Sequence, residues 1–96
     1  MLRALMLRKK INDAKKDIEA LRAKESDFET RAAEIQKRSD ETAQAIDEAQ
    51  TEEEKQAVEE AITAIENDQA ALETEKSEND QKIADLEGEV SEMEKE

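Results

Sequence analysis

Apolar side chains recur along this chain at alternating steps of three and four residues, in two separate runs. The first run spans residues 4–49 and the second spans residues 55–93. Such spacing places one narrow stripe on one side of an α-helix, and its persistence over many heptads is typical of a coiled coil. The pattern therefore predicts two long helices. The large apolar residues that we expect in the seam between them are Ile11, Ile18, Leu21, Phe28, Ile35, Ile46, Val58, Ile62, Ile65, Leu72, Ile83, Leu86, Val90 and Met93.

The two stripes do not share a phase. Continuing the first stripe would place its next members at Glu53 and Gln56, but the second stripe starts at Lys55, two residues late. A coiled coil absorbs insertions of three or four residues, whereas a slip of two turns the stripe by about 200° at roughly 100° per residue. We therefore expect the chain to turn back, with helices over about residues 2–49 and 52–95 and a turn over about 50–52.

A helix start signal supports this turn. Thr51 and Glu54 form a Thr-x-x-Glu capping box, in which the hydroxyl accepts a bond from the N–H three residues on and the carboxylate reaches back to the N–H of the cap itself. Glu52, Glu53 and Glu54 also place negative charge in the first turn, where the helix dipole favours it. A cation site in this acidic run is the weaker interpretation, because successive side chains on a helix point in different directions.

Folding the chain at the turn predicts an all-α fold, an antiparallel two-helix coiled-coil hairpin. When partner residue numbers add up to 104, as for Leu21 and Ile83, the two stripes stay in register along their whole length. Polar Glu25 then faces Asn79, where a hydrogen bond between the two side chains would fix the register. Because a lone pair of helices leaves much of its surface in water, further self-association of the hairpin would bury more of it.

Charge agrees with the antiparallel arrangement. The net charge is −13, yet residues 1–24 carry eight basic and three acidic side chains, a balance of +5 that leaves −18 for the remainder. A parallel homodimer would stack the basic segment on itself. Exposed ion pairs contribute only a few tenths of a kcal/mol each, so they select orientation more than they stabilise the fold. The register predicts ion pairs between Arg8 and Glu94, Lys15 and Glu87, Arg22 and Asp80, Lys10 and Glu96, Arg31 and Glu75, and Arg38 and Asp68.

The chain lacks side chains on which many enzyme mechanisms depend. The chain contains no His and no Cys, which removes imidazole bases, thiol nucleophiles and most transition-metal sites. We expect a non-enzymatic protein with no cofactor and no metal. No run of about 18 apolar residues is present, so we expect no membrane partner. The basic first quarter lacks interleaved aromatic residues for stacking on bases, which argues against nucleic-acid binding.

The first turn adds apolar surface outside the stripe, at Leu2, Leu5 and Met6. Two interpretations are open for these residues, a frayed end that lacks partner residues and a docking patch for a neighbouring subunit. In the predicted register, Ala4 and Leu7 would pair with positions beyond residue 96. We therefore expect the second helix to continue and the chain to be the N-terminal piece of a longer protein.

Several segments carry a family resemblance, namely Met1 to Ile11, Ala14 to Lys24, Phe28 to Arg31 and Thr51 to Lys55. Together they resemble the N-terminal scaffolding (delta) domain of Hong Kong 97-like tailed-phage major capsid proteins, over all 96 residues. The resemblance implies a role in procapsid assembly in the host cytoplasm, with the domain inside the procapsid. The implied partners are the protein's own shell domain, neighbouring copies and a maturation protease that removes the domain.

A second interpretation comes from a different class of function. The same hairpin would serve as a generic coiled-coil spacer or partner-binding module of a longer host protein. The sequence that follows residue 96 discriminates between the two. A shell-type domain there favours the capsid interpretation, whereas a sensor or motor domain favours the spacer.

Overall fold

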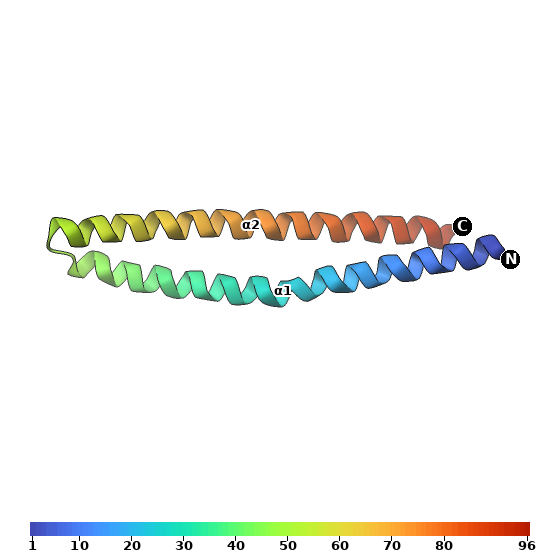
Figure 1. Ribbon diagram of the computed structural model, residues 1–96, viewed down its shortest axis with the longest axis horizontal. Coiled ribbons are helices and arrows are strands. Elements are labelled where there is room, and N and C mark those ends of the chain that lie inside the picture. Colours follow the sequence, from blue (N-terminus) through green and yellow to red (C-terminus); the bar gives the residue numbers. More distant parts are fainter. The chain divides into compact units, whose positions relative to one another are not determined.

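The computed structural model describes all 96 residues as two α-helices joined by a short turn (Figure 1). Helix α1 spans Leu2–Glu48 and helix α2 spans Glu52–Lys95, and no strand is present. These bounds agree with the predicted ones to within one residue. The predicted all-α helical hairpin is confirmed.

The composition explains why both helices run without a break. The chain has no Pro and a single Gly, and it is rich in residues with high helix propensity. The one glycine, Gly88, lies inside α2, and a Cβ added there would meet nothing within 4 Å. No other part of this chain approaches Gly88. Within the chain it is therefore a weak spot that the helix tolerates.

The turn is held by a capping box that differs from the predicted one in a single bond. The backbone N–H of Glu54 donates to the Thr51 hydroxyl at 3.1 Å, as expected. The Glu54 carboxylate, however, accepts from the N–H of Gln50 at 2.9 Å and not from that of Thr51. The reason lies at the end of α1, where the Ala49 N–H still bonds the Ala45 carbonyl. Gln50 therefore carries the first donor that α1 leaves without a helical partner, and Glu54 satisfies it.

Side chains from the two helices pack together in two units. The terminal unit comprises Met1–Ser26 with Lys76–Glu96, and the turn unit comprises Asp27–Glu75. Each unit has its own small hydrophobic cluster, in which the most buried side chains keep a few per cent of their surface exposed. In the terminal unit the buried members are Ala14, Ile18, Ile83 and Val90, flanked by Ile11, Leu21, Leu86 and Met93. In the turn unit they are Phe28, Ile35, Ile65 and Leu72.

Candidate helix–helix interface

The predicted seam matches the observed one at all but one of its large apolar residues. Ile18, Phe28, Ile35, Ile65, Leu72, Ile83 and Val90 are buried. Ile11, Leu21, Val58, Ile62, Leu86 and Met93 are half-buried. Burying a side chain of this size contributes about 1.5–3 kcal/mol, so this seam supplies most of the apolar stabilisation that the hairpin has.

The prediction for Ile46 is wrong, because 52% of this residue is exposed. Near the turn, α1 faces α2 through Thr42, Ala45 and Ala49, which are half-buried. The link between the helices is only three residues long, from Ala49 to Thr51. Such a short link determines which face of α1 meets α2, and the small Ala45 occupies the place that heptad continuation assigns to the bulky Ile46.

The turn unit buries only one row of its stripe on each helix. Phe28 and Ile35 lie one heptad apart on α1, and Ile65 and Leu72 lie one heptad apart on α2. At the alternate stripe positions of this unit, Ala32, Gln69 and Ile46 are exposed and Ile62 is only half-buried. The terminal unit differs, because both rows contribute buried residues there. The seam of the turn unit is therefore the narrower of the two.

Asn79 is the one buried polar side chain, with 5% of its surface exposed. Its amide nitrogen donates to the backbone carbonyl of Leu21 at 3.0 Å. The predicted partner was Glu25, whose side chain is instead exposed, so this prediction is wrong. Two physical reasons account for the difference. A helical carbonyl has a second lone pair for an additional donor, and leaving the Glu25 carboxylate in water avoids the cost of burying a charge.

Two ion pairs cross the seam in the turn unit, and both were predicted. Arg31 bonds Glu75, and Arg38 bonds Asp68 at 2.6 Å. The hydrogen bond to Glu75 is the main cause that raises the pKa of the Arg31 guanidinium above its ordinary value, with smaller contributions from Glu75 and two aspartates nearby. Both pairs are more than a third exposed, so they help to align the helices more than they stabilise them.

In the terminal unit the ion pairs differ from the predicted ones. Arg22 pairs with Glu87 at 2.7 Å and not with Asp80. Lys15 pairs with Glu94 at 3.9 Å and not with Glu87. Each observed acidic partner therefore lies one heptad further along α2 than predicted. The other two predicted pairs, Arg8 with Glu94 and Lys10 with Glu96, do not form.

The shift follows from the direction of side chains on a helix. Each Cα–Cβ bond tilts toward the N-terminus of its own helix. In an antiparallel pair the side chains of Arg22 and Glu87 therefore lean toward each other, whereas those of Arg22 and Asp80 lean apart. The register in which partner numbers add up to 104 identifies residues at the same height along the two helices. It does not account for the tilt of each side chain toward the N-terminus of its helix.

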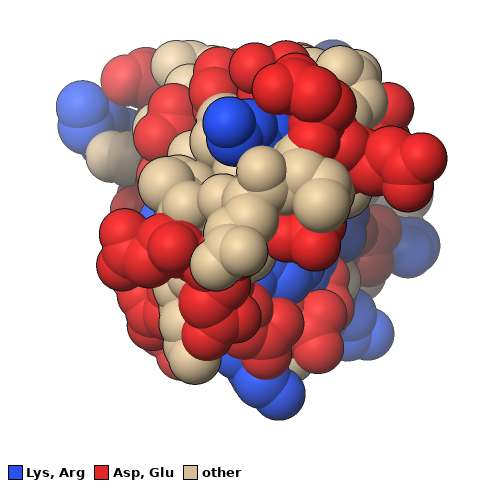
Figure 2. Space-filling view, turned by 90° about the vertical axis from the view of Figure 1, so that its left-hand side faces the viewer, with Lys and Arg blue, Asp and Glu red and all other residues tan.

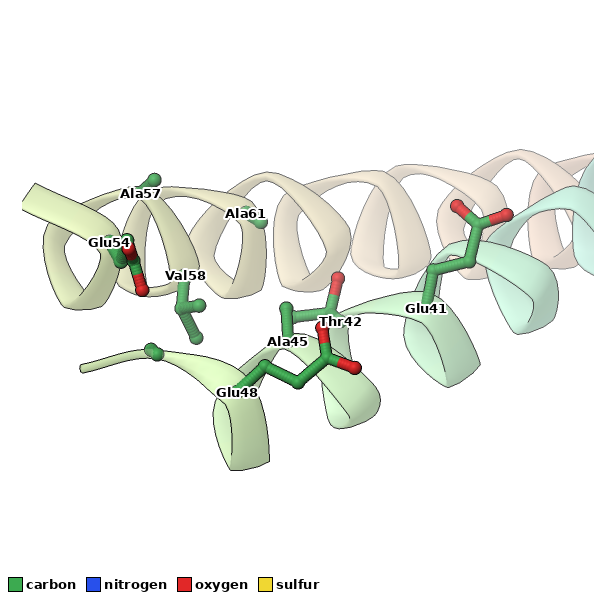
Figure 3. A pocket seen from close by; sticks show the side chains of 9 residues that line it. Glu41, Thr42, Ala45, Glu48, Glu54, Ala57, Val58 and Ala61 are labelled. Carbon is green, nitrogen blue, oxygen red and sulfur yellow. The ribbon is translucent and has the colours of Figure 1, made fainter. Parts of the chain in front are cut away.

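A groove in the turn unit was not predicted. It is an open groove of about 360 Å³ between the end of α1 and the start of α2. In Figure 3, Val58 points from α2 toward α1, and Thr42 and Ala45 point from α1 toward α2. We call this feature the alanine groove. Its lining residues are Glu41, Thr42, Ala45, Glu48, Ala49, Glu54, Ala57, Val58 and Ala61.

The sequence does contain a signal for this groove. Arg31 and Arg38 lie one heptad apart on α1 and carry the ion pairs of the turn unit. One heptad further along α1 the residue is Ala45, and the matching position on α2 is Ala61. Ala45 and Ala61 thus occupy the heptad positions at which the preceding heptads have ion-paired side chains. The apolar seam is left uncovered at this point.

Apart from the terminal Met1, the most exposed large hydrophobic side chains of the protein lie in the first turn of α1. Leu2 is 81% exposed, and Leu5 and Met6 are each 55% exposed. We call these three residues the N-terminal patch. The neighbouring Arg3 and Arg8 are exposed as well. The patch thus combines apolar and positively charged surface.

Comparisons with known proteins do not assign this chain to a family. No family model, curated protein or solved structure matches the chain. Neither helix is apolar enough over a sufficient length to cross a membrane, and no three acidic side chains are grouped as metal ligands would be. The seam, the alanine groove and the N-terminal patch are the features from which a function can be inferred.

Proposed function

We propose that this chain is a non-enzymatic scaffolding domain of a tailed-phage major capsid protein, which guides procapsid shell formation through helix–helix contacts and is removed on maturation. The observation that carries the proposal is the N-terminal patch. Leu2, Leu5 and Met6 expose apolar surface on a helix whose remaining large apolar residues, Ile46 aside, are covered by the partner helix. Exposed apolar surface of this kind marks sites of protein–protein contact. The sequence resemblance to scaffolding domains agrees with that role.

The mechanism depends on many weak contacts. Copies of the domain that are attached to neighbouring shell subunits meet at high effective concentration, so a contact that is weak in solution becomes populated inside the shell. Such contacts bias the angle between subunits and so the size of the shell. The net charge of −13 repels nucleic acid, which favours removal of the domain before the genome enters. The partners in this proposal are the shell domain, neighbouring copies and a maturation protease.

Deletion tests the proposal directly. Removing residues 1–96 from the parent protein is expected to lower the yield of closed shells and to broaden their diameters, as measured by electron microscopy and sedimentation. A parent protein with Leu2, Leu5 and Met6 replaced by Gln is expected to show the same defect, since the patch is lost while the seam stays intact. The matched control is Ile46→Gln, which changes an exposed apolar residue outside the patch. Unchanged shell yield and diameter after the deletion would contradict the proposal.

A further inference from the structure

We propose that the N-terminal patch of one copy docks into the alanine groove of a second copy. The contact is head to tail, because it joins two different surfaces of the same chain. It rests on the proposed assembly function for its biological purpose, whereas the contact itself can be measured on the isolated chain.

The shape of the groove is the first observation. Its floor is made of methyl groups from four alanines together with Thr42 and Val58, and its volume of about 360 Å³ lies in the range of sites that accept a few large side chains. The next heptads of the turn unit are bridged by the ion pairs of Arg38 and Arg31. The hollow of about 280 Å³ beside these pairs is lined mainly by charged side chains. The alanine groove is therefore the more apolar of these two hollows and the better suited to an apolar side chain from outside.

The electrostatics of the patch are the second observation. Helix α1 has no acidic residue in its first turn, and Arg3 lies there instead. A cation at a helix N-terminus is unfavourable, because the helix dipole already places positive charge at that end. Arg3 and Arg8 form no ion pair within the chain. The patch consequently favours an apolar surface that is bordered by carboxylates.

The turn unit provides such a surface. Glu41, Glu48 and Glu54 border the alanine groove. Figure 2 views the turn side of the turn unit, where Asp and Glu predominate around uncharged residues, with a few Lys and Arg among them. Leu5 and Met6 have the size to fill the floor of the groove, and the guanidinium groups of Arg3 and Arg8 would meet the carboxylates at its border. In this arrangement the apolar side chains of the patch meet the apolar floor of the groove, and its arginines meet the carboxylates at the border.

This charge distribution favours a second copy of the chain as the binding partner of the groove. Both complementary surfaces occur on one chain, so every copy has one patch and one groove. A contact between two different surfaces is heterologous, and it extends into rows or rings instead of stopping at a symmetric dimer. Copies inside a shell could therefore link from one subunit to the next.

Cysteine cross-linking tests the contact, since the chain has no cysteine of its own. One sample carries Leu5→Cys, and a second sample, with a distinguishing mass tag, carries Ala45→Cys. After mixing under mild oxidation, the mixed disulfide is expected to form at least about tenfold more than with Ile46→Cys in place of Ala45→Cys, because docking raises the effective concentration of one thiol near the other. Ile46 is the matched control, because it is exposed and next in sequence but does not line the groove.

Charge reversal provides an independent measurement. Sedimentation of the full chain is expected to show open-ended association that increases with concentration and weakens with added salt. Arg3→Glu with Arg8→Glu, or Glu41→Lys with Glu48→Lys, should each weaken the association. Mixing the two variants should restore open-ended association, because the patch of each variant is then opposite in charge to the groove of the other. Circular dichroism verifies that each variant stays helical.

The outcomes separate the contact from the assembly role. Equal cross-linking of Ala45→Cys and Ile46→Cys, dominant Leu5→Cys homodimers, or a chain that stays monomeric at every concentration would each overturn the docking proposal. None of these results affects the deletion experiment on shells, so the assembly function would stand with another contact. Conversely, head-to-tail docking together with normal shells after deletion would keep the contact and remove the assembly role.

Discussion

The side chain of Asn79 on α2 donates a hydrogen bond of 3.0 Å to the main-chain carbonyl of Leu21 on α1. Because the acceptor is backbone, the bond does not depend on which side chain α1 presents opposite Asn79. The amide is thus satisfied inside the seam of the terminal unit while Glu25 stays in water. A buried polar group of this kind favours one helix pairing over others at some cost in stability.

Replacing this amide should raise stability and lower specificity. Asn79→Leu is expected to increase the free energy of unfolding by about 1 kcal/mol, because an apolar side chain replaces a buried amide. The same variant should show more high-mass species in sedimentation, because the helices gain alternative partners. Glu25→Gln is the control and should change the free energy of unfolding by less than about 0.5 kcal/mol. A larger loss in the control would mean that Glu25 takes part in the register after all.

Two isoleucines of α1 should respond differently to the same substitution. Ile35 is 7% exposed and Ile46 is 52% exposed, although the heptad pattern places both in the seam. Ile35→Ala is expected to lower the free energy of unfolding by about 2–5 kcal/mol, whereas Ile46→Ala should cost less than about 0.5 kcal/mol, as an exposed substitution does. Urea denaturation followed by circular dichroism measures both. Equal losses would show that α1 keeps its heptad phase up to the turn.

The shifted ion pairs can be measured by double-mutant cycles. Alanine substitutions at Arg22 and Glu87 should give a coupling energy of about 0.2–1 kcal/mol at low salt, the range for exposed pairs. The cycle between Arg22 and Asp80 should give a coupling near zero, since these side chains lean apart. Added salt should reduce the first coupling. A stronger coupling to Asp80 would contradict the pairing that the structure shows.

Gly88 can report on contacts beyond the single chain. Nothing in this chain would meet an added methyl group, so Gly88→Ala should raise the free energy of unfolding by about 0.5–1 kcal/mol through higher helix propensity. Ala84→Gly, one turn earlier on the same helix, should lower it by a similar amount. Thermal unfolding followed by circular dichroism measures both. If Gly88→Ala left the hairpin stable but weakened self-association, another helix would approach α2 at this glycine.

The seam was predictable because the spacing of side chains along a helix is a local property. The phase slip near Thr51 placed the turn, and the stripe identified residues such as Ile18, Leu72 and Ile83 that the structure buries. The capping box was predictable for the same reason. Only its second bond differs, because Glu54 satisfies a donor left by the preceding helix.

The ion pairs show that the helix register alone does not predict which charged side chains meet. The pairs of Arg31 and Arg38 were predicted correctly, whereas Arg22 and Lys15 bind acids one heptad further on. Residues at one level of an antiparallel pair need not touch, because each side chain leans toward its own N-terminus. The heptad pattern does not predict the alanine groove, because it identifies which residues lie in the seam and not whether their side chains fill it. The replacement of charged by small side chains at Ala45 and Ala61 was its visible sign.

The sequence by itself determined that this protein is two long helices, where they end, and which stripe of each helix is covered by the other. These properties follow from helical periodicity, capping and the absence of proline, all of which act within a few residues. Only the tertiary structure decided that Ile46 lies outside, that Asn79 bonds a carbonyl, and which acid each base meets. Those outcomes depend on how the short turn orients one helix against the other and on the direction in which paired side chains lean, and neither is encoded in heptad spacing.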